Sequence, residues 1–297
     1  MKRVFLIVLA AVAAFIFTGC VPGQGVFSAV STESAPPSGA SDPSAVTIES
    51  AVLLDSDGVR VTAEELDMNG SRLGPTIRLL IENDTERSLT FQCGCVAVNG
   101  YVTESIFFAT VGAGKQASDS ITLLNTSLAD CGVETPAEIS LWLRAIDSDS
   151  LDVYINAPLS TLFTSAFGKT EQVYDESGGV IFDSEGFKLV EKGLDGDYSF
   201  VEPSILVYSH NTTGRQLHVL ATGLLVNGHE VSCICSFDLP DGMRSVGRVL
   251  MSGADLLEAG IASASELTSA EISFRVTDRE TGETVAVIEA APLEFGD

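Results

Sequence analysis

The chain has 297 residues, 45% of them hydrophobic, and a formal net charge of −25 from 41 acidic and 16 basic side chains. This length predicts about two domains, and the hydrophobic content excludes a chain that is disordered throughout. The acidity disfavours binding to nucleic acids or to anionic lipid headgroups, because their phosphates would repel the chain. No nucleic-acid partner is therefore expected.

The N-terminus has the layout of an export signal. A basic start precedes an apolar run over residues 4–17, which is too short for a comfortable transmembrane helix. The run ends in Phe17-Thr18-Gly19-Cys20, which resembles the lipobox of bacterial lipoproteins, with Phe17 at the place where leucine is usual. The resemblance implies that residues 1–19 are a signal peptide and that Cys20 carries the lipid. The alternative is an ordinary signal peptide or an uncleaved anchor.

Lipidation would anchor the protein to the extracytoplasmic face of the cell membrane, through burial of the acyl chains. The next segment, residues 20–45, is rich in Ser, Ala, Pro and Gly. This composition predicts a flexible tether, because it cannot bury enough apolar area to offset the entropy lost on ordering. Coil scaling gives such a tether an average span of roughly 25–30 Å.

The rest of the chain repeats itself at a spacing of 128 positions. "LDSDG" at 54–58 returns as "FDSEG" at 182–186, and "VNGY" at 98–101 returns as "VNGH" at 226–229. Further matches continue along both copies, with a few added residues late in the second. The sequence therefore predicts an internal duplication of a unit of about 115 residues.

Each copy has the pattern of a β structure. Asn99-Gly100 lies between two apolar runs and predicts a two-residue hairpin turn, because both turn positions need a positive φ. About eight short strands and one short helical turn are expected in each copy. The predicted fold is all-β, with two tandem immunoglobulin-like β-sandwiches at 46–160 and 173–297, joined by a connector at 161–172.

The copies are similar to β-sandwich modules that occur in tandem in lipid-anchored surface proteins of Gram-positive bacteria. In the first copy the resemblance rests on "IEND", "RSLTFQ", "VNGY", "SLADCGV" and "EISL". It covers both copies and implies an immunoglobulin-like fold at the cell surface. It implies no activity, because these modules as a class have none assigned. The cysteines depart from the pattern.

In the first copy, Cys93 and Cys95 are expected on the core-facing side of one strand, together with Leu89 and Phe91. A disulfide within the pair would be strained, since neighbours at i and i+2 lie about 6.5–7 Å apart at Cα. Two interpretations stay open: buried thiols that pack as small hydrophobic groups, or a disulfide from Cys131 to Cys93 or Cys95.

In the second copy, counting from the turn at Asn227 places His218 opposite Phe237 and on the same face as Cys233 and Cys235. Two thiolates and an imidazole are ligands for a soft metal such as zinc or copper(I). The alternative is that all three residues pack in the core.

Motifs of known enzymes are missing from the sequence. There is no G-x-S-x-G elbow, and "HEVSC" at 229–233 lacks the second histidine of H-E-x-x-H. "FTSAFGKT" ends like a phosphate loop but has Phe163 where the first glycine of that motif should be. Acidic turns such as "DSDG" are explained by turn geometry, with calcium as the alternative. Trp142 is predicted in the first core. The apolar residues Leu162, Phe163 and Phe167 in the connector predict that the two units dock.

Together these features predict a non-catalytic, membrane-anchored surface lipoprotein that binds an extracellular protein or glycan and needs no cofactor. The alternative is a metal-binding or redox-responsive surface protein that uses His218, Cys233 and Cys235. A third hypothesis is an enzyme that acts on cell-wall glycans through a pair of carboxylates.

Overall fold

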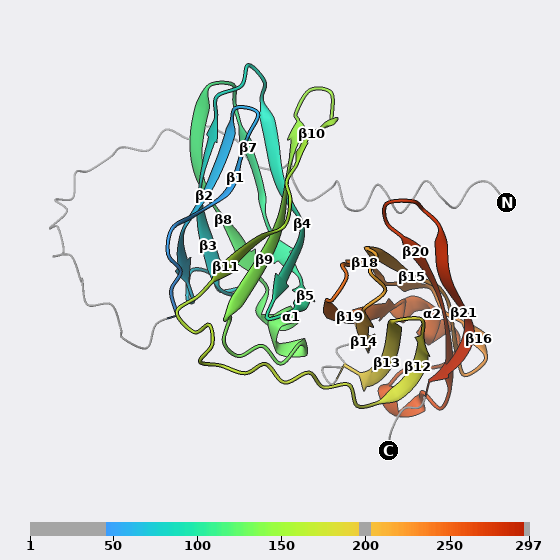
Figure 1. The fold of residues 1–297 in the computed structure, drawn as a ribbon. Helices are drawn as coiled ribbons and strands as arrows, with labels where there is room; N and C mark the ends of the chain where they lie inside the picture. The colour runs from blue at the N-terminus through green and yellow to red at the C-terminus, as the bar shows by residue number, and fades with distance from the viewer. Residues whose placement is uncertain (1–45, 196–202, 294–297) are drawn as a thin grey trace, which may run out of the picture. The chain divides into compact units, whose positions relative to one another are not determined.

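The computed structural model describes residues 46–195 and 203–293, all of which belong to one compact unit. The predicted signal peptide, the tether and the lipidation site at Cys20 lie outside the described residues. Within those ranges, no helix is long and apolar enough to cross a membrane. The fold is all-β, as the sequence predicts, and consists of two β-sandwiches (Figure 1).

The first sandwich packs two antiparallel sheets against each other. One sheet has the order β1 (Ala51–Ser56), β2 (Val59–Asp67), β3 (Thr76–Asn83), β8 (Lys115–Leu123) and β6 (Ser105–Ile106). The other has β10 (Val153–Asn156), β9 (Glu138–Asp147) and β4 (Leu89–Val98), with β11 (Ser160–Phe163) on β9 and both β5 (Tyr101–Thr103) and β7 (Phe108–Val111) on β4. The short helix α1 covers Asn125–Asp130.

The second sandwich has the same arrangement. One sheet contains β12 (Gly179–Ser184), β13 (Phe187–Leu194), β14 (Ser204–Asn211), β19 (Arg244–Met251) and β17 (Cys233–Ile234). The other contains β21 (Thr284–Leu293), β20 (Ala270–Asp278) and β15 (Leu217–Val226), with β16 (His229–Glu230) and β18 (Ser236–Leu239) on β15. Helix α2 covers Gly253–Glu258, and a 3₁₀ turn follows at Ala264–Glu266.

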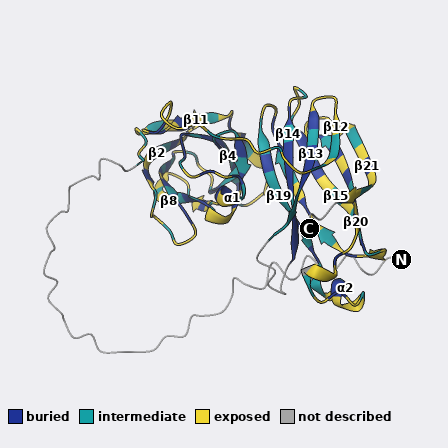
Figure 2. Cartoon of the chain, turned by 90° about the horizontal axis from the view of Figure 1, so that it is seen from below, coloured by how far each residue is buried: buried dark blue, intermediate teal, exposed yellow. Residues whose placement is uncertain are grey.

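Alternation of side chains along the strands builds the two cores. In β3, Ile77, Leu79 and Ile81 are fully buried, because every second side chain points to the same face of a sheet. Central strand β14 is entirely buried or half-buried, whereas half of the residues of β21 at the edge are exposed (Figure 2). Each sandwich therefore has its own hydrophobic core between its sheets.

Strand β9 corrects one prediction from the sequence. Leu141 and Leu143 are buried in the first core, and Trp142 between them is only half-buried. Because neighbours in a strand point to opposite faces, the core can take the two leucines or the tryptophan, but not all three. The prediction that Trp142 fills the core is therefore wrong.

The two sandwiches match element by element at the spacing of 128. The bounds of β1, β3, β4 and α1 return unchanged in β12, β14, β15 and α2. The β-bulges also correspond: the register shifts between Val52 and Leu54 in β1 and between Val180 and Phe182 in β12. A bulge is a local irregularity that a fold does not require, so its presence at the same position in both sandwiches shows that the backbones follow the same path.

A buried asparagine holds the same turn in each sandwich. The Asn83 side-chain amide donates to the carbonyls of Arg87 and Val111 at 2.8 and 2.9 Å, and Asn83 itself is fully buried. Asn211 does the same in the second sandwich, with two bonds of 2.8 Å. These bonds give backbone carbonyls of the turn a side-chain donor and so hold its path.

A strand pair is one of the contacts through which the sandwiches dock, and the apolar residues of the predicted connector are not part of it. Tyr101 in β5 pairs in parallel with Arg244 in β19, which joins one sheet of each sandwich into a continuous sheet. Leu162 is buried within β11, so the first sandwich extends to Phe163, beyond the boundary predicted at residue 160. Phe163 and Phe167 are exposed and pack on each other, with ring centroids 4.4 Å apart.

Candidate functional site

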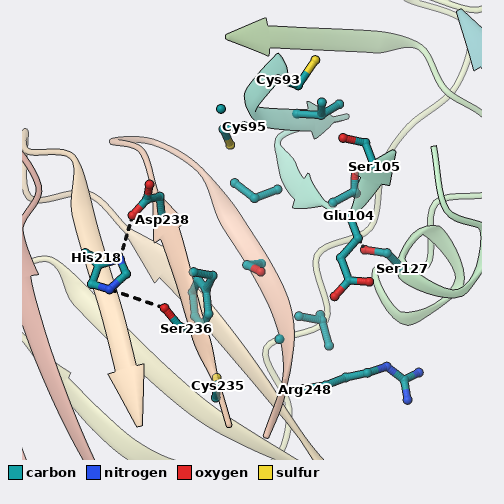
Figure 3. A pocket seen from close by; sticks show the side chains of 18 of the residues that line it. Cys93, Cys95, Glu104, Ser105, Ser127, His218, Cys235, Ser236, Asp238 and Arg248 are labelled. Carbon is teal, nitrogen blue, oxygen red and sulfur yellow. Dashed lines mark hydrogen bonds and ion pairs between the residues drawn. The ribbon is translucent and has the colours of Figure 1, made fainter. Parts of the chain in front are cut away.

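A cavity of about 430 Å³ opens where the first sandwich's β4–β5 region meets β15, β18 and β19 of the second (Figure 3). The first sandwich contributes Cys95, Glu104 and Ser127 to its wall, among other residues. The second contributes His218, Ser236, Asp238, Arg248 and Arg279. The wall is therefore rich in hydroxyl and charged groups, which can orient a polar ligand.

The pairing of β15 with β18 brings three polar side chains together. His218 lies opposite Asp238 in the register, and Leu220 lies opposite Ser236. The His218 Nδ1 atom is 2.7 Å from Asp238 Oδ1, and its Nε2 atom is 3.5 Å from Ser236 Oγ. Arg279 Nε donates to the second carboxylate oxygen of Asp238 at 3.2 Å. Ser236, His218 and Asp238 thus form a linear hydrogen-bonded chain, which we call the polar relay.

The observed register differs by one residue from the predicted one, which placed Phe237 opposite His218. The prediction counted straight through the turn at Asn227. In the structure the chain leaves this sheet after β16: Cys233 in β17 pairs with Met251 in β19, and only β18 returns to β15. Because the chain changes sheets here, counting alternate residues from the turn does not predict which face of the sheet Ser236 takes.

The predicted metal site at His218, Cys233 and Cys235 is not formed. Cys233 lies in β17 of the other sheet, and Cys235 packs in the second core. Within the described residues, no group of three or more His, Cys, Asp or Glu side chains could hold a metal ion. The sheet change at β17 is again the physical reason.

The thiols of the first copy also differ from the prediction. A bulge between Cys93 and Cys95 shifts the register of β4 against β9, after which Val96 and Val98 take the core positions. Cys93 packs against the first core as expected, whereas Cys95 pairs with Trp142 and falls on the opposite face. Both cysteines line the cavity. The predicted sharing of one face is therefore wrong for Cys95.

None of the five described cysteines is in a disulfide, so Cys131 is bonded neither to Cys93 nor to Cys95. Cys131 packs within the first core. Burial raises the pKa of all three thiols to about 12, because a thiolate is poorly solvated there. These thiols behave as small hydrophobic groups, which was the other interpretation left open by the sequence.

Arg248 forms the charged end of the cavity wall. It donates to both oxygens of Asp130, from Nε and Nη2, at 2.8 Å each, and it also pairs with Asp195. Burial raises the pKa of Asp130, although the bonds from Arg248 act in the opposite direction. Since Asp130 belongs to the first sandwich and Arg248 to the second, this bidentate pair links the two.

The acidic turn at residues 146–152 is explained by its own hydrogen bonds. Asp147 Oδ1 accepts from the backbone amides of Asp149 and Ser150 at 3.0 and 3.1 Å, and Oδ2 accepts from Arg87 at 2.7 Å. These bonds lower the pKa of the Asp147 carboxyl below its ordinary value. Both oxygens thus shape the turn, which favours the turn interpretation over calcium.

Reasoning from the sequence found His218 but missed Ser236 and Asp238. The available signal was the alternation Ser-Phe-Asp at 236–238, which places the hydroxyl and the carboxylate on one face of a strand. That signal is weak by itself, because the alternation does not say which residue of the neighbouring strand lies between the two.

No model of a known protein family and no curated protein matches the chain. The YadV chaperone resembles it at 10% identity and a TM-score of 0.21, over 72% of this chain and 89% of the other. A protein of unknown function from Porphyromonas gingivalis W83 resembles it at 12% identity and a TM-score of 0.21, over 80% of this chain and 100% of the other. A 1.5-MDa bacterial ice-binding adhesin resembles it at 14% identity and a TM-score of 0.18, over 78% of this chain and 72% of the other. At such TM-scores these likenesses carry no argument.

Proposed function

We propose that the chain is a lipid-anchored surface lipoprotein of the bacterial cell membrane and that its double sandwich serves to bind a partner. A lipid on Cys20 would hold it at the extracytoplasmic face, and residues 20–45 would act as the tether. The partner would be an extracellular protein or a glycan. The proposal rests on the sequence resemblances together with what the two sandwiches have in common.

The positions that correspond between the sandwiches shape the backbone. Asn83 and Asn211 bind the carbonyls of equivalent turns, and Asn99 and Asn227 both adopt positive φ, at 51° and 50°. The cysteines do not correspond, since the position of Cys93 is occupied by alanine in the second copy. A pair of modules that keeps its path and varies its other side chains supports a scaffold for recognition.

The redox-responsive alternative has less support. A thiol reacts as its thiolate, and burial raises the pKa of Cys235 to about 12 and also raises that of Cys233. Thiolate is therefore scarce at neutral pH, and the predicted metal set is separated between two sheets.

Lipid anchoring is tested by metabolic labelling of a bacterial host with an alkyne fatty acid, comparing the full chain with its Cys20→Ala variant. We expect label and membrane fractionation for the full chain, and neither for the variant. Label that persists after the substitution, or a soluble full chain, would refute the anchoring.

The binding role is tested separately, with the purified protein on glycan arrays and against purified extracellular matrix and surface proteins. Saturable binding to a protein or glycan is expected. If all of these fail to bind while labelling succeeds, the protein is anchored and the binding proposal is wrong.

A further inference from the structure

The polar relay has the connectivity of a nucleophile, a base and an orienting acid. Asp238 accepts from Nδ1 of His218, which leaves the lone pair of Nε2 directed at the hydroxyl of Ser236 (Figure 3). The bond of Arg279 to the other oxygen of Asp238 fixes the carboxylate in place. A hydrogen bond on Nδ1 selects the tautomer in which Nε2 can take a proton.

The first sandwich shows that the fold does not require these side chains. At the positions 128 earlier, Thr90 and Thr110 stand in place of His218 and Asp238, and their hydroxyls are 3.1 Å apart. Phe108 stands in place of Ser236. A neutral threonine pair therefore suffices at this place on the sheet, and the charged relay is particular to the second sandwich.

The relay is also accessible. The His218 and Asp238 side chains are 31% and 25% exposed, so they are partly removed from water, whereas Ser236 is exposed at the cavity wall. A distance of 3.5 Å from Ser236 Oγ to His218 Nε2 is long for a hydrogen bond, but such contacts shorten when substrate binds. The volume of about 430 Å³ admits a small ester.

We propose that Ser236, His218 and Asp238 form a nucleophilic site that hydrolyses small carboxylic esters. This activity goes beyond the proposed binding role, and it replaces the expectation from sequence that the protein is non-catalytic. Ser236 is the nucleophile, His218 the general base and acid, and Asp238 the positioning residue. Arg279 also lines this wall, and its bond to Asp238 holds that carboxylate.

The reaction takes two balanced steps. Ser236 Oγ bonds to the acyl carbon while its proton moves to Nε2 of His218; the bond to the alkoxy group then breaks, and the alcohol leaves with that proton. Water next attacks the acyl-serine, gives a proton to Nε2, and the released Ser236 recovers it. The products are an alcohol and a carboxylic acid, with no oxidation or reduction.

The test uses the purified full chain with p-nitrophenyl acetate and with a fluorophosphonate probe, which labels activated serines. We expect hydrolysis above the rate of heat-denatured protein and an adduct located on Ser236 by mass spectrometry. Ser236→Ala and His218→Ala should lose about 10²-fold or more of the rate, and imidazole should partly restore the His218→Ala variant. Asp238→Asn should lower the rate and alter its pH profile.

Ser269→Ala is the matched control, because Ser269 is an exposed serine of the second sandwich that does not line the cavity. It should retain hydrolysis and labelling. Melting curves establish that the variants fold, which is expected for Ser236→Ala since that side chain is exposed. A wild-type rate no higher than that of Ser236→Ala, or an adduct elsewhere than Ser236, would overturn the proposal.

Discussion

Removal of the buried asparagine from either sandwich should cost several kcal/mol of stability. In Asn83→Ala, the carbonyls of Arg87 and Val111 lose donors at 2.8 and 2.9 Å, and the Thr85 amide and hydroxyl lose their shared acceptor, Asn83 Oδ1, at 3.1 and 2.7 Å. A net hydrogen bond contributes about 1 kcal/mol, and a buried group left without a partner costs about 1–3 kcal/mol. We expect a loss of about 3 kcal/mol.

Asn211→Ala should lose a similar amount, because its side chain makes the equivalent bonds in the second sandwich and is equally buried. Asn69→Ala is the control: that residue is exposed, and a change within about 0.5 kcal/mol is expected.

Urea unfolding measures all three variants. Trp142 is the only tryptophan, so its fluorescence follows the first sandwich, while circular dichroism follows both. If Asn83→Ala stays within 0.5 kcal/mol of the Asn69→Ala control, the hydrogen bonds do not hold the turn and the reasoning is refuted.

Three further predictions concern charge and thiols. Arg248→Ala should lower the free energy of unfolding, measured in urea, by about 2 kcal/mol, because it leaves the mostly buried Asp130 without its cation. Arg60→Ala is the control: it removes an exposed pair and should lower that free energy by under about 1 kcal/mol. Equal losses in the two variants would contradict this. The lowered pKa of Asp147 adds stability above about pH 4 that is lost as pH falls through the folded pKa, so Asp147→Asn should flatten the acid limb of Tm against pH. Iodoacetamide at pH 8 should modify Cys233 before the other four described thiols, because burial raises their pKa to about 12. A mass spectrum in which one of those four is modified earlier would count against this.

The sequence predicted the features that depend on a few neighbouring residues. Asn99 and Gly100 form the expected turn, with φ of 51° and 80°, because a positive φ is a local property of those residue types. The all-β class follows from apolar alternation in the same way. The spacing of 128 also predicted where equivalent strands of the two copies begin and end.

The sequence did not determine which face a side chain takes beyond an irregularity. The bulge after Cys93 moves Cys95 out of the first core, and the passage of β17 into the other sheet places Asp238, not Phe237, opposite His218. Each event shifts the alternation of side chains by one residue. Because neighbouring residues of a strand point to opposite faces, every side chain beyond the shift then lies on the face opposite to the one predicted.

Turns, strand class and the repeat were thus fixed by the amino-acid sequence itself, since short-range backbone preferences and hydrophobic patterning suffice for them. The junction of β5 with β19, the cavity beside it and the polar relay were decided by the tertiary structure. They depend on which strands pair and in which register, and that is set by the packing of both sandwiches together.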